Sequence, residues 1–581
     1  MTDALATFDE LCQRAVKAFL QTVVVIDNEA SLNSDSAREK EASIRAARKR
    51  APTPTKGERA SSSAGGGKKT HHANAALSSQ HNIEREPHRL ELNHVSRAFA
   101  AQELTCGVYL PSEQDPACRD ELVTETARAI LPTDACVLDW QLREGDSSPA
   151  IDAIKQVLKT DVHEGGRLRL VLVYTAENLD DASKQLKTAL ETDHEATLEN
   201  CKDGPVITGN HFRIRFVNKP TRGLTPDEHP DVVPWDGLPE RIIREFTALS
   251  RGLLRAFALQ SVAAVRRDMH RILAQFEEEL DPVYAGDRAT KLDQDDASGL
   301  IVDLLSSELN YTLFHSTLAK QCLNETGLFP WLDEKNTSFR DDADVLEVGG
   351  ETFHGVNSTS REALLKNREA RANGWLGEGS AVRVRKKFFP TDERAESASL
   401  KMAALSTLAR TSIGRARPPD GIRLRFGTIV RVQNKGTPQG DTAFYDDQAG
   451  VFLCLQPSCD TVRITDKRPF LMVRLVEDER KFVIALPEAS GFSRWRVPET
   501  DERFLLTPYF NSSHESDSVL AASDGDGEPS CFIDCDKRKW FWLADLRDLA
   551  AVEIRDKVLQ PFARTGLNSL EWLRLRATKG K

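Results

Sequence analysis

The residues best suited to chemistry follow the ends of four apolar stretches, such as VVVI and ACVL. They form an acidic cluster, a lone carboxylate, a hydroxyl and an ammonium, which are Asp27, Asn28, Glu29, Asp139, Thr175 and Lys219. If these stretches are parallel strands of an open sheet, their carboxyl ends meet where ligands bind. Oxygen ligands with a hard cation suit phosphate, and a lysine adds a point charge to a phosphoryl oxygen. The sequence therefore predicts one ligand site at a sheet edge.

The segments around these residues alternate between strand and helix patterns. The strand-like segments are TVVVID, TCGVYLP, DACVLDWQL, LRLVLVYTA and HFRIRFVNKP. Amphipathic segments such as RDELVTETARAIL lie between them. Strands that are apolar on both faces and alternate with helices predict a parallel sheet covered on both sides. The expected fold class is α/β, with an N-terminal doubly wound, five-stranded parallel sheet.

Composition divides the chain into further regions. The sheet domain is expected over residues 1–225, with an insertion over 31–90 that has no Phe, Trp or Tyr and cannot bury enough apolar surface to order itself. Helical patterns cover 235–330, and a polar connecting region covers 335–420. Short strands separated by Gly, Pro and Asp turns predict a β-rich domain over 421–581.

Two long helices are expected outside the sheet domain. Apolar residues from Ile242 to Phe276 recur at spacings of three and four, which predicts one long amphipathic helix over 240–280. We expect such a helix to pack in a helical bundle. Alternatively, it could form the interface of a homodimer or transmit a signal along the chain. A final helix over 545–576 closes the β-rich domain.

Composition excludes several classes of protein. The 581 residues carry a net charge of −11, so we do not expect non-specific nucleic-acid binding. No apolar run approaches the length of a membrane span, and the N-terminus lacks the pattern of a signal peptide. Ten scattered cysteines, mostly in apolar surroundings, fit a reduced protein. We therefore expect a cytoplasmic protein with no membrane partner.

The order and placement of the strand-end residues resemble the receiver domain of response regulators, the phosphoacceptor module of two-component signalling. The resemblance covers about residues 12–220. It is closest to divergent, insertion-bearing receivers of bacterial conflict and phage-defence operons, found beside histidine-kinase-like ATPases. It implies a receiver-like sheet, a histidine kinase as partner and a role in phosphorelay signal transduction, with antiviral defence as the setting.

The resemblance also implies a role for each residue. Asp139 is the phosphoacceptor, Thr175 the switch hydroxyl, Lys219 the conserved lysine and Phe216 the aromatic switch residue. The implied Mg²⁺ ligands are Asp27, Asn28, Glu29, Asp139 and the backbone carbonyl of Gln141.

The sequence departs from the receiver pattern in two ways. Asn28 stands where a second acid is usual, which removes one charge from the implied metal site. Thr175 and Lys219 are 44 residues apart, more than is usual, and the insertion follows the first strand. A receiver-like docking module that is not phosphorylated therefore stands as an alternative.

The C-terminal half contains no recognisable output module. Cys531 and Cys535 lack the partners of a zinc site, and Cys459 with Asp460 lacks a nearby His. We expect signalling through a downstream protein partner rather than catalysis. A regulated effector enzyme with a site in this half is the alternative.

Overall fold

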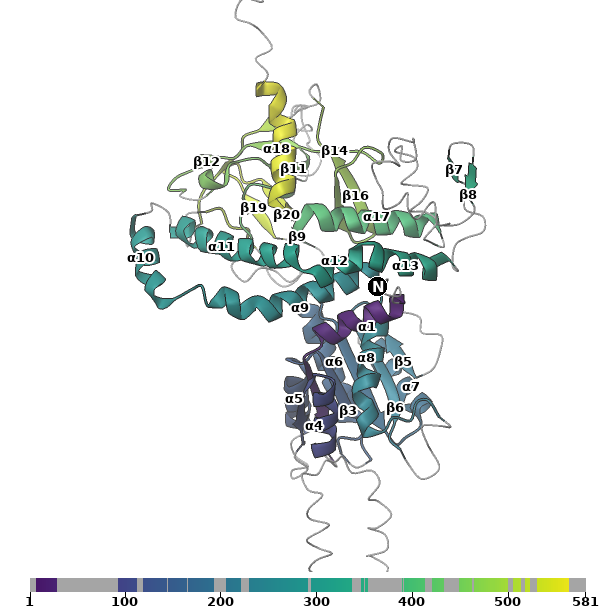
Figure 1. Cartoon of the computed structure of the whole chain (residues 1–581). Helices are drawn as coiled ribbons and strands as arrows, with labels where there is room; N and C mark the ends of the chain where they lie inside the picture. Colours follow the sequence, from purple (N-terminus) through teal and green to yellow (C-terminus); the bar gives the residue numbers. More distant parts are fainter. Residues whose placement is uncertain are drawn as a thin grey trace, which may run out of the picture. The chain divides into compact units, whose positions relative to one another are not determined.

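The structure is a computed structural model of the chain (Figure 1). It describes residues 7–28, 92–111, 119–143, 145–164, 166–192, 205–220, 229–290, 294–336, 346–348, 351–353, 389, 391–412, 421–432, 449–461, 464–499, 505–513, 518–522 and 530–563. The expected insertion over 31–90 and Glu29 lie outside these residues. The chain divides into two compact units, one over residues 1–290 and 296–334 and the other over 291–295 and 335–581.

A six-stranded sheet forms the centre of the first unit. Its strands are β1 (Thr22–Ile26), β2 (Thr105–Tyr109), β3 (Ala135–Asp139), β4 (Arg169–Thr175), β5 (Val206–Thr208) and β6 (Phe212–Asn218). Their order is β2-β1-β3-β4-β6-β5, and all neighbours are parallel except β5, which pairs antiparallel with β6. The expected α/β fold with a doubly wound sheet is confirmed, but the sheet has a sixth strand. This three-residue strand is too short to give a readable pattern.

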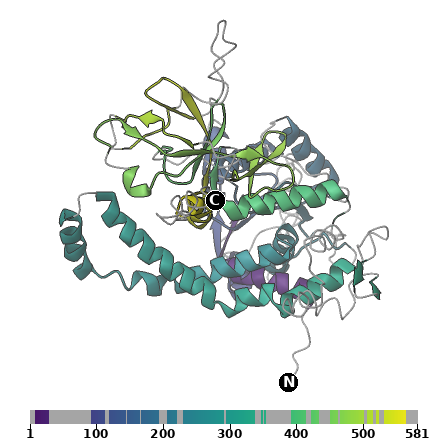
Figure 2. The ribbon, with the colours of Figure 1, turned by 90° about the horizontal axis from the view of Figure 1, so that it is seen from above.

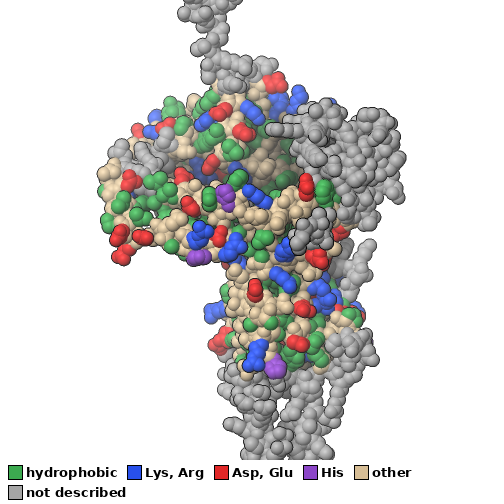
Figure 3. All heavy atoms as spheres, viewed as in Figure 1, with side chains coloured by type: hydrophobic (Ala, Val, Ile, Leu, Met, Phe, Trp, Pro, Cys, Tyr) green, Lys and Arg blue, Asp and Glu red, His purple; other side chains and the backbone are tan. Residues whose placement is uncertain are grey.

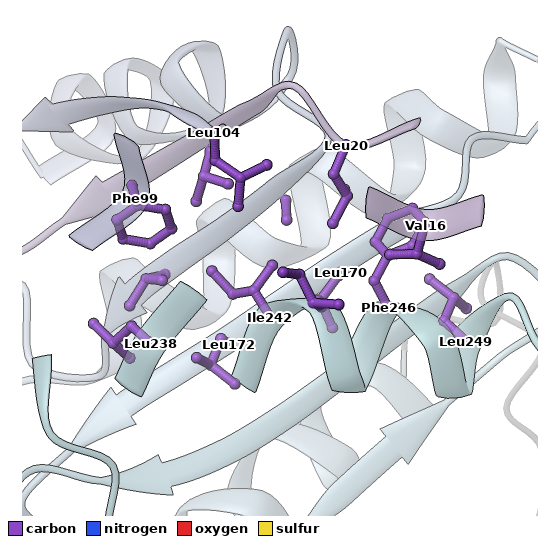
Figure 4. Packing of buried hydrophobic residues seen from close by; sticks show 14 of the residues in the cluster. Val16, Leu20, Phe99, Leu104, Leu170, Leu172, Leu238, Ile242, Phe246 and Leu249 are labelled. Atoms are coloured by element: carbon purple, nitrogen blue, oxygen red, sulfur yellow. The ribbon is translucent and has the colours of Figure 1, made fainter. Parts of the chain in front are cut away.

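Helices cover both faces of this sheet. They are α1 (Phe8–Phe19), α4 (Leu92–Ala101), α5 (Arg119–Ile130), α6 (Ser148–His163), α7 (Leu179–Glu191) and α8 (Leu238–Leu249). The helices α1, α4 and α8 share one hydrophobic core with β1, β3 and β4. Figure 4 shows this core, with Phe246 of α8 close to Val16 of α1. The helices α5, α6 and α7 share the core on the opposite face.

The long helix expected over 240–280 is wrong, because the chain breaks between α8 and α9 (Leu253–Leu273). Gly252 joins the two helices at φ 154°, in the region of positive φ that favours glycine. The two helices also have different surroundings. Residues of α8 pack on β4 and β6 as well as on α1, whereas α9 packs against α1 and α12 (Thr317–Leu323).

The remaining elements of the first unit are helical. They are η2 (Trp235–Gly237), η3 (Glu278–Leu280), α10 (Asp281–Thr290), α11 (Gln294–His315) and α13 (Glu325–Asn336). In Figure 2 the teal helices from α9 to α11 follow one another along an arc.

The second unit is rich in strands. Its main sheet has the order β17-β13-β11-β10-β20-β19, with β9 paired to β20. The strands of that sheet are β9 (Leu408–Thr411), β10 (Thr428–Val432), β11 (Gly450–Cys454), β13 (Met472–Arg474), β17 (Leu505–Leu506), β19 (Cys531–Ile533) and β20 (Lys539–Leu546). Smaller sheets contain β7 (Leu346–Val348), β8 (Glu351–Phe353), β12 (Arg468–Pro469), β14 (Val476–Glu477), β15 (Ile484–Glu488), β16 (Gly491–Arg496) and β18 (Tyr509–Phe510).

The described helices of the second unit are α17 (Asp392–Thr407), η5 (Ser458–Asp460) and α18 (Asp548–Ala563). The closing helix was expected from Asp545, but β20 continues through Leu546. Asp545 is buried and accepts a hydrogen bond from the Thr428 hydroxyl at 2.8 Å, which ties it to β10. The strand-rich C-terminal region with a final helix is confirmed.

Candidate functional site

The sheet register brings the predicted strand-end residues together. Asp139 and Thr175 are the last residues of β3 and β4, and Asp27 and Lys219 lie within a residue of the ends of β1 and β6. These four strands are parallel neighbours, so their ends meet at one edge. The Lys219 N–H donates to the Thr175 carbonyl oxygen at 2.8 Å, which continues the pairing of β6 with β4 past the strand ends.

Lys219 joins the two carboxylates of the site. Its Nζ donates to Asp27 Oδ2 at 3.0 Å and to Asp139 Oδ2 at 2.8 Å. All three side chains are less than a tenth exposed. Two acids and one ammonium give the described part of the site a formal charge of −1, which favours a further cation.

Burial has opposite effects on the intrinsic pKa values of the acid and the base. Burial raises the pKa of Asp139 to about 6; Lys219 opposes this rise and Asp27 adds to it. Burial alone would lower the pKa of Lys219, but the carboxylates of Asp139 and Asp27 outweigh burial and raise it. Lys219 therefore stays protonated as the counterion of both acids.

One comparison with known proteins assigns a family to the part of the chain that carries these residues. Residues 19–223 match a family model described as "Response receiver domain". This part of the chain is a divergent receiver domain. The match ends before α8, and the C-terminal half has no family match. No curated protein and no solved structure matches the chain.

The two residues predicted to act as the switch, Thr175 and Phe216, are both buried. The Thr175 hydroxyl accepts a hydrogen bond from the Glu177 N–H at 3.1 Å. Phe216 lies in β6 and is fully buried, with its ring 5.6 Å from the Trp140 ring in an edge-on arrangement. Trp140 directly follows Asp139 in the sequence. The pair of Trp140 with Phe216 therefore lies next to Asp139 along β3 and its following loop.

The side-chain oxygen of Asn28 indicates whether the residues at this sheet edge suit a bound Mg²⁺. The side-chain Oδ1 of Asn28 is buried without a hydrogen-bond partner among the described residues. Asn28 directly follows Asp27, and carboxylate, amide and carbonyl oxygens are the ligands that hard cations take. The Asp27 and Asp139 carboxylates together with this oxygen fit the ion. Among the described residues, no cluster of three or more His, Cys, Asp or Glu side chains could hold a metal, and the predicted ligand Glu29 lies outside those residues.

The loops after β3 and β4 are joined by a contact that the sequence did not indicate. The Gln141 side-chain amide donates to the Glu177 carboxylate, and its Oε1 accepts from the Gly145 N–H at 3.3 Å. The Gln141 N–H donates to Asp139 Oδ1 at 3.3 Å. Glu177 was missed because only the residues at the strand ends were considered. Its place two residues after Thr175 was the available signal.

The candidates in the C-terminal half do not form a site among the described residues. Cys531 is buried in β19, whereas Cys535 is exposed and contacts the Asn511 side chain. Asp460 accepts a hydrogen bond from the Gln456 side chain at 3.3 Å, and nothing is described of the Cys459 side chain. In the part of the chain that is described, no helix is long and apolar enough to cross a membrane.

Proposed function

We propose that this protein is a response-regulator-like signalling protein whose receiver domain accepts a phosphoryl group on Asp139 from a histidine kinase. Phosphoacceptor function is what a receiver domain supports at the level of the family. The observation that carries the assignment to Asp139 is its place at the end of β3, in direct contact with Lys219 and beside Asp27.

The proposed transfer is an attack of one Asp139 carboxylate oxygen on the phosphorus of a phosphohistidine. A P–O bond forms and the P–N bond breaks, and the leaving imidazole takes up a proton. Lys219 holds the carboxylate in place before transfer, and its positive charge then lies beside a phosphoryl oxygen. A bound Mg²⁺, held by Asp27, Asn28, Asp139 and the Gln141 carbonyl, with Glu29 as a further predicted ligand, would supply positive charge that screens the anionic reactants.

Thr175 and Phe216 provide the proposed readout. The Thr175 oxygen already accepts from Glu177, so its own proton is available for donation to a phosphoryl oxygen. Such a bond would draw the loop after β4 toward Asp139 and change the packing of Phe216 on Trp140. A charge change that biases a small repacking is the physical basis of such switches.

Incubation of the full chain with Mg²⁺ and acetyl phosphate, followed by a phosphate-affinity gel, tests the proposal. Wild type should give a shifted band that is lost at alkaline pH. Asp139→Asn should give none, and Asp152→Asn, which changes a partly exposed acid on α6 that pairs with Arg119, should behave as wild type. No shifted band with acetyl phosphate or with a phosphorylated histidine kinase would leave the alternative, a receiver-shaped docking module.

The wider biological setting is also part of the proposal. A histidine kinase as donor and a role in bacterial phage defence follow from the resemblance of the strand-end residues. The proposed cytoplasmic location rests on the composition, and the proposed downstream protein partner on the unassigned C-terminal half. Loss of protection against phage in cells carrying Asp139→Asn, compared with wild type, would support that setting. A metal-dependent catalytic activity of the full chain would instead favour the regulated effector enzyme.

A further inference from the structure

Helix α11 exposes an unusual amount of apolar surface. Its sequence places Leu, Ile, Val, Tyr and Phe residues on more than one side. A helix that is apolar all round is normally buried. However, no side chain of α11 is buried among residues 298–315, which are the ones described. The described side chains of α11 therefore leave much of its apolar surface exposed.

The exposed apolar side chains are concentrated around this helix. Of the 24 large apolar side chains exposed among the described residues, 14 lie between Leu254 and Leu323. Hydrophobic side chains gather over α10 and α11 in Figure 3. An apolar surface that clusters in this way is typical of an interaction site, whereas isolated exposed apolar residues need no explanation.

One stripe of α11 has the spacing of a helix-pairing seam. Leu300, Leu304, Ser307, Tyr311 and Phe314 follow one another at intervals of four, three, four and three residues. The four large members are between 49% and 68% exposed. A repeat of 3.5 residues keeps one stripe against a partner helix along its whole length. The partner that this stripe fits is therefore another helix.

We propose that α11 packs antiparallel against α11 of a second copy of this chain. The stripe is self-complementary about Ser307, because the aliphatic half with Leu300 and Leu304 would face the aromatic half with Tyr311 and Phe314. A two-fold axis through the small serine makes both contacts at once. A hollow of about 660 Å³ beside Tyr311 and Phe314, walled also by Phe257 of α9, provides space for the partner's side chains.

The available surface is sufficient for a dimer only if the neighbouring helices take part. The 22 residues of α11 span about 33 Å, and a stable interface needs about 800 Å² from each copy. The stripe covers little more than two heptads, which is short for an isolated two-stranded coil. Leu318 of α12 and Leu254 of α9 are also exposed, so these helices extend the apolar surface.

Light scattering coupled to size-exclusion chromatography tests the oligomeric state of the full chain. Wild type should be a dimer at micromolar concentration. Leu304→Glu should raise the dissociation constant of the dimer at least about 100-fold. The two-fold axis places one substituted residue from each copy in the interface, and each should weaken binding about tenfold. Leu549→Glu changes a 75% exposed leucine at the start of α18 and should leave the dimer intact. Circular dichroism would confirm that both variants are folded.

A photo-crosslinking phenylalanine analogue at position 311 distinguishes the partner. The predicted product has the mass of two chains and joins Tyr311's position to a peptide of α11 in the other copy. A wild-type monomer, a dimer that Leu304→Glu leaves unchanged, or crosslinks confined to one chain would each overturn the proposal. Asp139→Asn should dimerise as wild type does, so this result is independent of phosphoacceptance.

Discussion

Replacing Lys219 by Met removes the only ammonium that the described residues place between Asp27 and Asp139. The lysine nitrogen lies 3.0 Å and 2.8 Å from the two carboxylates, and all three groups are buried. The variant therefore leaves two buried acids without their counterion. Asp139→Asn, the matched variant, removes one acid and keeps the pair of Lys219 with Asp27.

The distances give the size of the expected difference. At an effective dielectric constant of about 20, each attraction across about 3 Å is worth roughly 5 kcal/mol before desolvation. The two acceptor oxygens share one nitrogen and so lie at most about 6 Å apart, where they repel by roughly 3 kcal/mol. Lys219→Met loses both attractions and should destabilise the receiver domain by about 3–5 kcal/mol. Asp139→Asn loses one attraction but also the repulsion and one desolvation cost, so we expect a change within about 1 kcal/mol.

Hydrogen exchange of the full chain, measured on peptides of β1, β3 and β6, checks this asymmetry. Without Mg²⁺, Lys219→Met should speed exchange in these strands at least about 100-fold, because each 1.4 kcal/mol is a factor of ten. Asp139→Asn should change exchange by less than about tenfold. Added Mg²⁺ should protect the Lys219→Met strands more than those of wild type, since a cation there replaces the lost charge.

Two results would refute this reasoning. Equal destabilisation by Lys219→Met and Asp139→Asn would show that lost side-chain packing, rather than the excess of negative charge at the site, determines the stability of these variants. Unchanged exchange in Lys219→Met would show that the three side chains do not form the contacts described. Peptides of β10 and β20, in the second unit, provide the internal control and should exchange equally in all variants.

Three further changes test other parts of the structure. Asn28→Asp should tighten Mg²⁺ binding about tenfold by calorimetry, because it adds a carboxylate to the ligand set; an unchanged affinity would place Asn28 outside the site. Asp161→Ala should destabilise the receiver domain by about 3–5 kcal/mol, because it leaves the fully buried Arg169 without its charge partner. The control Glu191→Gln changes an exposed ion pair and should alter stability by less than about 0.5 kcal/mol. Chemical denaturation of each variant, with unfolding of the receiver domain monitored by hydrogen exchange, measures both stability changes. Trp140→Phe should abolish a fluorescence change on adding Mg²⁺ with beryllofluoride, because Trp140 directly follows Asp139; a change retained in the variant would mean that another tryptophan reports it.

The sequence predicted the sheet well because its central strands are buried on both faces. The apolar runs ending at Asp139 and Thr175 have the length and composition of parallel strands, and β3 and β4 end at those residues. The edge strand β5 was not predicted, since its three residues are too few to show a strand pattern. Periodicity failed over 240–280, because residues on both sides of Gly252 keep the helical spacing while the backbone turns there.

The site was predictable as a set of residues but not as a network. Parallel strand ends must meet at one edge, so Asp27, Asp139 and Lys219 could be grouped from their positions alone. That one ammonium contacts both acids depends on side-chain geometry, which spacing does not specify. The contact of Phe216 with Trp140 likewise joins residues 76 positions apart and has no local signal.

The central claim is that Asp139 is the phosphoacceptor, and mass spectrometry of the acid-stable product tests it most directly. Full-length protein treated with acetyl phosphate and Mg²⁺ is reduced with borohydride, which converts an aspartyl phosphate into homoserine, and is then digested. The account predicts homoserine at position 139, dependent on Mg²⁺ and strongly reduced in Lys219→Met. Modification at a different residue, or none with any phosphoryl donor, would contradict it.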